Sequence, residues 1–104
     1  MARLATVIVE GRSMAPTYRS GDWLLALWKI FASAPKIGAI LVIERDEQPG
    51  ILYVKRLTEI NSAGELYLSS DNEAGTDSRQ WGWLPMRSVR AKVLFRVRKA
   101  RIEK

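Results

Sequence analysis

The sequence predicts a small, mostly β protein with little helix, folded as a single barrel-like or open sheet. Three observations support this prediction: several short runs of β-branched and aromatic residues, glycine or proline turn signals between them, and few stretches with helical periodicity. The chain has 104 residues, close to the commonest size of one domain. We therefore expect one domain over 1–104, with a basic C-terminal end at 96–104.

The first half of the chain contains three expected strands. Residues 6–9 are β-branched and end before Gly11, which reads as a short buried strand. Residues 23–28 follow a Ser-Gly-Asp turn signal, and their length favours a strand. Residues 39–43 form a continuous apolar run of the kind found in buried strands.

The second half continues the pattern. Residues 52–57 should pair with 39–43 as a hairpin, because Gln48-Pro49-Gly50 supplies the backbone angles of a turn. A further strand is expected at 65–68, followed by a polar loop without periodicity over 71–82. A loop of that length in a small domain is typical of a functional segment.

The last expected strand covers 90–99 and alternates between apolar and basic residues. Period-two alternation predicts one buried and one solvated face. The apolar set, expected in the core, is Ala91, Val93, Phe95 and Val97; the basic set, expected in solvent, is Arg90, Lys92, Arg96 and Arg98.

Composition excludes most hydrolase mechanisms. The chain contains no cysteine and no histidine, so a Ser-His-Asp triad, a Cys-His pair and a histidine or thiolate metal site are all excluded. We expect neither a metal nor a cofactor. An enzyme with this composition must move protons with lysine, aspartate, glutamate or tyrosine.

Charge and hydropathy set expectations for location and partners. No apolar stretch reaches the roughly 20 residues that span a bilayer, and no signal peptide precedes the first strand, so we expect a cytoplasmic protein. A shortened form of an anchored enzyme would instead be membrane-associated. Net charge is +6, and eight of the 17 basic residues follow position 86. That end could make a weak contact with an anionic membrane surface, whereas we do not expect nucleic acid as a partner.

Lys55 occupies the apolar side of its expected strand, between Tyr53 and Leu57. Burial disfavours the ammonium form and lowers the pKa, which is how a lysine becomes a general base. The strand pattern fits equally well a lysine that buries only its methylenes and keeps its nitrogen in water. Ser13, taken alone, reads as an ordinary turn residue.

Four ordered segments resemble the motif boxes of signal peptidase I. They are residues 9–17 (Val-Glu-Gly-Arg-Ser-Met-Ala-Pro-Thr) with the Gly-Asp at 21–22, then 53–56 (Tyr-Val-Lys-Arg), 70–72 (Ser-Asp-Asn) and 77–82 (Asp-Ser-Arg-Gln-Trp-Gly). The resemblance implies a fold like that of LexA and signal peptidase and a serine endopeptidase with a Ser/Lys dyad. The short form looks particularly like the maturation proteases of nickel-type superoxide dismutase.

The resemblance also implies roles for individual residues. Ser13 would be the nucleophile and Lys55 the general base that takes its proton. An N-terminal signal or propeptide-like extension would bind as an extended strand and be cut after small residues. Residues implied to support the oxyanion or the dyad are Gly11, Asp71, Thr76, Asp77 and Arg79; those implied to line substrate pockets are Val9, Met14, Tyr53 and Val54.

Two positions depart from the family pattern. Gly11 stands where many bacterial signal peptidases have a serine that donates to the oxyanion. Gly75 stands where the family has a serine that hydrogen-bonds the lysine, and we expect Thr76 to substitute for it. If the departure only weakens the enzyme, a serine at position 75 or 76 should raise the rate.

Three other functions are consistent with parts of the sequence. A self-cleaving peptidase domain of the LexA type shares the Ser-Met-x-Pro, Gly-Asp and Lys-Arg motifs, although no Ala-Gly pair precedes Ser13. A nucleic-acid-binding β-barrel would account for the basic residues and tryptophans, and would show binding that falls steeply with salt. A catalytically inactive scaffold would account for the change at Gly75.

Overall fold

The computed structural model describes residues 3–28 and 35–100. Within them the chain forms one antiparallel sheet of strand order β1-β2-β6-β3-β4-β5, which confirms the mostly β fold with little helix. The elements in chain order are β1 (Arg3–Ile8), β2 (Trp23–Trp28), β3 (Ile40–Glu44), β4 (Leu52–Ile60), β5 (Leu66–Ser69), the helix α1 (Ser78–Trp81), the 3₁₀ turn η1 (Met86–Ser88) and β6 (Val89–Arg98).

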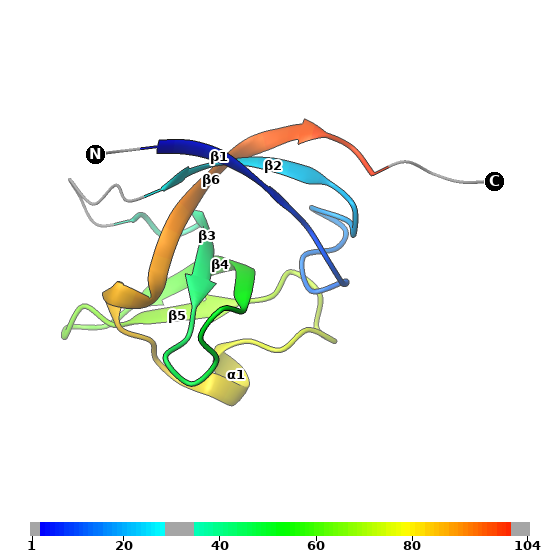
Figure 1. The fold of residues 1–104 in the computed structure, drawn as a ribbon. Coiled ribbons are helices and arrows are strands. Elements are labelled where there is room, and N and C mark those ends of the chain that lie inside the picture. The colour runs from blue at the N-terminus through cyan, green and yellow to red at the C-terminus, as the bar shows by residue number, and fades with distance from the viewer. Residues whose placement is uncertain (1–2, 29–34, 101–104) are drawn as a thin grey trace.

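Strand β6 connects the two halves of the sheet. Figure 1 shows β1 and β2 above, β3, β4 and β5 below, and the long β6 running from one group to the other. Each half packs its own apolar cluster, and β3 contributes to both because its side chains alternate in direction. Leu41 and Ile43 belong to the cluster with β4 and β5, while Val42 belongs to the cluster with β2 and β6.

The expected hairpin between β3 and β4 is confirmed. The strands pair antiparallel from Ile40 opposite Arg56 to Glu44 opposite Leu52. Gly50 takes a φ of 88°, a conformation that residues with a side chain rarely adopt, and its N–H donates to Glu44 Oε2 at 2.8 Å. This hairpin fixes the position of Lys55 along β4.

The prediction that Phe95 and Val97 lie in the core is wrong, whereas Arg96 and Arg98 are exposed as expected. Phe95 and Val97 are 54% and 47% exposed. The register between β2 and β6 shifts between Leu25 and Ala26, so that Leu94 is an extra residue on β6. One extra residue reverses the side on which the next side chains fall, and a second shift, between Trp23 and Leu24, makes Val97 a further extra residue. Arg96 therefore lies opposite the buried Leu24, and Phe95 points to solvent.

The predicted loop over 71–82 ends in the short helix α1. Asp77 caps the helix, its side chain accepting from Arg79 N, and Gln80 completes a capping box by accepting from Asp77 N. In the described part of the chain, no helix is long and apolar enough to cross a membrane. Residues 101–104 of the basic C-terminal end lie outside the described residues.

Candidate active site

Ser13 lies in a compact turn that follows β1. Gly11 has a φ of 81°, which lets the chain leave the strand direction sharply. Two backbone hydrogen bonds then close the turn, from Ala15 N to Arg12 O at 3.0 Å and from Tyr18 N to Met14 O at 2.8 Å. The Ser13 side chain is consequently held at the protein surface and remains partly accessible.

Lys55 projects from β4 into the protein interior. It is 1% exposed, and its Nζ hydrogen-bonds to Ser70 Oγ at 3.1 Å. The rings of Tyr53 and Trp81 lie 5.5 Å and 5.8 Å from the same nitrogen. Burial lowers the pKa of Lys55 from 10.5 to about 8; the negative charge of Asp77 opposes this shift and the positive charge of Arg79 adds to it.

Ser13 and Lys55 open onto the same cleft, which has a volume of about 370 Å³. Gly75 stands between the groups that line it. A Cβ placed on Gly75 would lie 2.7 Å from Ser13 Cβ and only 2.4 Å from Ser70 Oγ. The two serine side chains therefore approach the same point, and one of them contacts the lysine amine. The structure thus brings the predicted nucleophile and base to one site.

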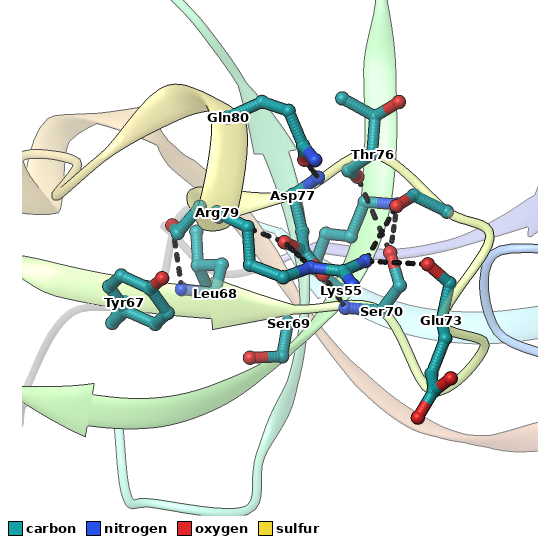
Figure 2. A network of polar contacts seen from close by, with 12 residues as sticks. Lys55, Tyr67, Leu68, Ser69, Ser70, Glu73, Thr76, Asp77, Arg79 and Gln80 are labelled. Carbon is teal, nitrogen blue, oxygen red and sulfur yellow. Dashed lines mark hydrogen bonds and ion pairs between the residues drawn. The ribbon is translucent and has the colours of Figure 1, made fainter.

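Ser70 is the site residue that the sequence interpretation missed. It occupies the position next to Lys55 because β4 and β5 pair with Arg56 opposite Ser69. The hydroxyl of Ser70 contacts Lys55 Nζ on one side and donates to the Thr76 carbonyl at 3.3 Å on the other, as Figure 2 shows. The Ser-Asp-Asn motif at 70–72 was the sequence signal that could have pointed to it.

This arrangement corrects the expectations for positions 75 and 76. A serine at position 75 would collide with Ser70 and Ser13, so it should damage the site and not raise the rate. Thr76 takes part through its backbone carbonyl, which accepts from Ser70. The lysine-contacting hydroxyl comes from Ser70, in the same loop but five residues before the position where the motif comparison placed it.

Asp77 and Arg79 organise the loop that covers Lys55. Asp77 is 1% exposed and accepts from Ser70 N at 2.7 Å and from Arg79 Nε at 3.0 Å. Burial by itself would raise the pKa of Asp77, but these hydrogen bonds outweigh it and the pKa lies below its usual value. Arg79 also donates to the carbonyl of Glu73, as Figure 2 shows, and to that of Gly75, which orders the loop beside Ser13.

Asp71 anchors the segment that carries Ser13. Its carboxylate accepts two hydrogen bonds from Arg56, both at 2.9 Å, and one from Thr17 Oγ1 at 2.6 Å. The next residue, Asn72, donates its backbone N–H to the Ser13 carbonyl at 2.8 Å. Asp71 therefore acts at a distance from the reacting atoms, by joining the nucleophile turn to β4.

The four residues predicted to bind substrate lie together. They line one small pocket of about 110 Å³ beside Ser13, on the side of β1 and of the start of β4; they are Val9, Met14, Tyr53 and Val54. Most of the residues that line this pocket have apolar side chains, and Val9 and Met14 among them are buried, so we call it the apolar pocket. Ser13 and Glu10 line both this apolar pocket and the cleft that holds Lys55.

A comparison with known protein families gives one match. The family model described as Peptidase S24-like matches residues 2–80, which include Ser13, Lys55, Ser70 and Asp77. The chain belongs to the Peptidase S24-like family. No curated protein matches the sequence. As a Peptidase S24-like protein the chain is of the serine-peptidase kind, in the superfamily that LexA-type and signal-peptidase-like enzymes share.

Proposed function

We propose that this Peptidase S24-like protein is an endopeptidase in which Ser13 is the nucleophile and Lys55 the general base. The observation that carries the proposal is a buried amine, with a pKa of about 8, on the same cleft as a partly exposed serine. At pH 7 an amine with that pKa is neutral in about one molecule in ten, against fewer than one in a thousand at the ordinary lysine pKa. Neutral lysine is the form that can accept a proton.

The reaction proceeds in two halves. As Ser13 Oγ bonds to the scissile carbonyl carbon, its proton passes to Lys55 Nζ; the intermediate then breaks its C–N bond, and the Lys55 ammonium protonates the leaving amine. Water attacks the resulting ester, gives a proton to Lys55, and releases the acid as Ser13 recovers its proton. The Ser13 backbone N–H is the first candidate donor to the oxyanion, since Gly11 offers no side chain for that purpose.

The open edges of two strands support substrate binding as an added strand. Within the described residues β1 pairs only with β2, and β4 pairs with β5 only from Arg56 onward. The Val9 N–H and carbonyl both bond toward the β2 side, to Asp22 and Gly21, so the backbone groups of its two neighbours face the open edge. A peptide lying there would use main-chain hydrogen bonds for affinity and the apolar pocket for selection.

The size of the apolar pocket supports cleavage after a small residue. A volume of about 110 Å³ fits an alanine-sized side chain far better than an aromatic one. The biological role we propose is removal of an N-terminal extension from a precursor, and the sequence motifs favour the precursor of a nickel-type superoxide dismutase. Self-cleavage of the LexA type is the second candidate, because the family match covers that class as well.

The test is cleavage of a peptide library, with products identified by mass spectrometry. We expect cuts after small residues, abolished by Ser13→Ala and by Lys55→Ala, and retained in the matched controls Ser62→Ala and Lys92→Ala at exposed positions. Wild-type rates in either dyad variant would overturn the assignment. Incubation of the chain alone distinguishes self-cleavage, since only that activity shortens the wild-type protein and leaves Ser13→Ala intact.

A further inference from the structure

Two hollows continue from the cleft on the side away from the apolar pocket. The first, about 430 Å³, is lined by Gly11, Arg12, Ala15, Pro16, Arg19 and Ser20. The second, about 360 Å³, is lined by Pro16, Arg19, Asp22, Arg96, Lys99 and Ala100. Gly11 and Arg12 line both the cleft and the first hollow, and Pro16 and Arg19 line both hollows. Together the two hollows form one groove, which we call the basic groove.

The basic groove and the apolar pocket lie on different sides of Ser13. Neither hollow shares a lining residue with the apolar pocket, whereas the cleft shares residues with the apolar pocket and with the first hollow. The order along the surface is therefore apolar pocket, cleft, first hollow, second hollow. If the apolar pocket takes the residue before the cut, the basic groove takes residues after it.

The basic groove carries surplus positive charge. Its cations are Arg12, Arg19, Arg96 and Lys99, and its acid is Asp22. Asp22 is buried and engaged, accepting from Ala100 N at 2.6 Å, from Arg19 N at 2.9 Å and from Arg96 Nη1 at 3.3 Å. Arg12 and Arg19 are exposed, and no ion pair to either occurs among the described residues.

The apolar pocket, on the other side of Ser13, is lined by no basic residue of the described chain. Glu10 lines both the apolar pocket and the cleft, and the residues around it in the apolar pocket are uncharged. A carboxylate bound on this side would meet a like charge, whereas a carboxylate in the basic groove would meet unpaired guanidinium groups. The two sides of Ser13 therefore favour different substrate chemistry.

We propose that the basic groove binds acidic side chains of the substrate that follow the scissile bond, so that the enzyme prefers aspartate or glutamate there. This inference rests on the proposed peptidase function. An extended peptide advances about 3.3 Å per residue, so several residues after the cut would lie along the two hollows. Arg12 and Arg19, which line the part of the basic groove nearest to Ser13, would be specificity-determining residues that contact substrate without taking part in the chemistry.

The experiment compares matched peptides that share one cleavage site and differ in the four residues after it, as Asp/Glu or as Asn/Gln. We expect the wild-type chain to cleave the acidic peptide about tenfold more efficiently, with the preference shrinking as salt rises from low to high ionic strength. Arg19→Gln should bring the ratio of the two rates close to one, and Arg19→Glu should favour a Lys-containing peptide. Lys92→Gln, which removes an exposed charge elsewhere, should leave the ratio unchanged.

The outcomes separate this inference from the proposed function. Equal cleavage of the two peptides by the wild-type chain overturns the inference and leaves the peptidase intact. If neither peptide is cleaved, the proposed function fails. Binding of the fluorescently labelled acidic peptide then tests whether the basic groove binds acidic residues. Salt-sensitive binding that Arg19→Gln removes supports the basic groove, and its absence overturns it. If Arg19→Gln keeps the peptide preference but loses binding to anionic vesicles, the inference is overturned, and the basic groove binds a lipid surface instead.

Discussion

The two faces of β4 hold neighbouring cations in opposite settings. Lys55 is buried, and its Nζ contacts the neutral hydroxyl of Ser70, so burial lowers its pKa. Arg56, the next residue, donates two hydrogen bonds to the Asp71 carboxylate, which raises the pKa of the guanidinium. The acid whose charge acts on Lys55 is Asp77, whose oxygens already accept from Ser70 and Arg79.

The two cations differ because Arg56 contacts a carboxylate directly and Lys55 does not. A cation in direct contact with a carboxylate keeps its charge and holds structure in place, as Arg56 does through Asp71 for the Ser13 turn. A cation removed from water without such a contact is destabilised in its charged form and can give up its proton. Adjacent positions on one strand acquire these roles because their side chains leave on opposite faces.

The largest expected effect comes from exchanging the two cations. Lys55→Arg keeps the charge but provides a group that stays protonated, so peptide cleavage should fall about a thousandfold. Arg56→Lys keeps a charge beside Asp71 and loses only the two-point contact, so the rate should fall much less, about threefold to tenfold. Steady-state kcat/KM on one peptide measures both, and comparable losses in the two variants would contradict the division of roles.

The next largest effect is expected at Gly75. Because a Cβ there would lie within 3 Å of both Ser70 and Ser13, Gly75→Ser should misplace the dyad and lower kcat/KM about a hundredfold. Ala63→Ser, in an exposed turn, adds the same hydroxyl without the collision and should behave like the wild-type chain. A rate gain in Gly75→Ser would restore the interpretation that a serine is missing from this position.

Gly75 and Ser70 illustrate which parts of the fold and of the site can be predicted from the sequence. All six strands are predicted from β-branched runs and turn residues, because those preferences act locally. The prediction for the first is wrong in detail: the strand spans Arg3–Ile8 and not 6–9, and it is mostly exposed where a buried strand is expected. The contact between Ser70 and Lys55 depends on how β5 aligns with β4, a pairing between distant segments that no local pattern sets. The exposure of Phe95 depends likewise on a bulge that the alternation of apolar and basic residues does not reveal.

A smaller effect is expected on stability. The shift in the pKa of Lys55 from 10.5 to about 8 corresponds to a cost of about 3 kcal/mol when the lysine is protonated in the fold. Below pH 8 both folded and unfolded chains keep the proton, and the cost is present in full. Between pH 8 and 10.5 the folded chain alone releases it, so this cost disappears and the free energy of unfolding rises with pH.

Lys55→Met should therefore raise the free energy of unfolding at pH 6 by about 1–3 kcal/mol while abolishing cleavage. The gain should shrink toward pH 10. Denaturant unfolding at the two pH values measures it, with Lys92→Met as the matched exposed control. A destabilised Lys55→Met at pH 6 would mean that the buried amine makes favourable contacts that outweigh its desolvation.

Among the site residues beside Gly75, Ser70→Ala should have the smallest effect on cleavage. Loss of one hydrogen bond to the amine should lower kcat/KM about tenfold. Because that bond is stronger to the ammonium than to the neutral amine, its loss should also move the rising limb of the pH profile to lower pH. Ser70→Thr, which keeps a hydroxyl, should recover part of the rate. A reduced rate with an unmoved pH profile would assign Ser70 a purely structural role.

The most direct measurement is an NMR titration of the Lys55 side chain in the Ser13→Ala variant, with ¹⁵N-labelled lysine and Lys55→Met for assignment. We predict that the Nζ signal titrates with a midpoint near pH 8, well separated from the other lysines. A midpoint near 10.5 would show an amine that keeps its proton at neutral pH, and Lys55 could not then serve as the base.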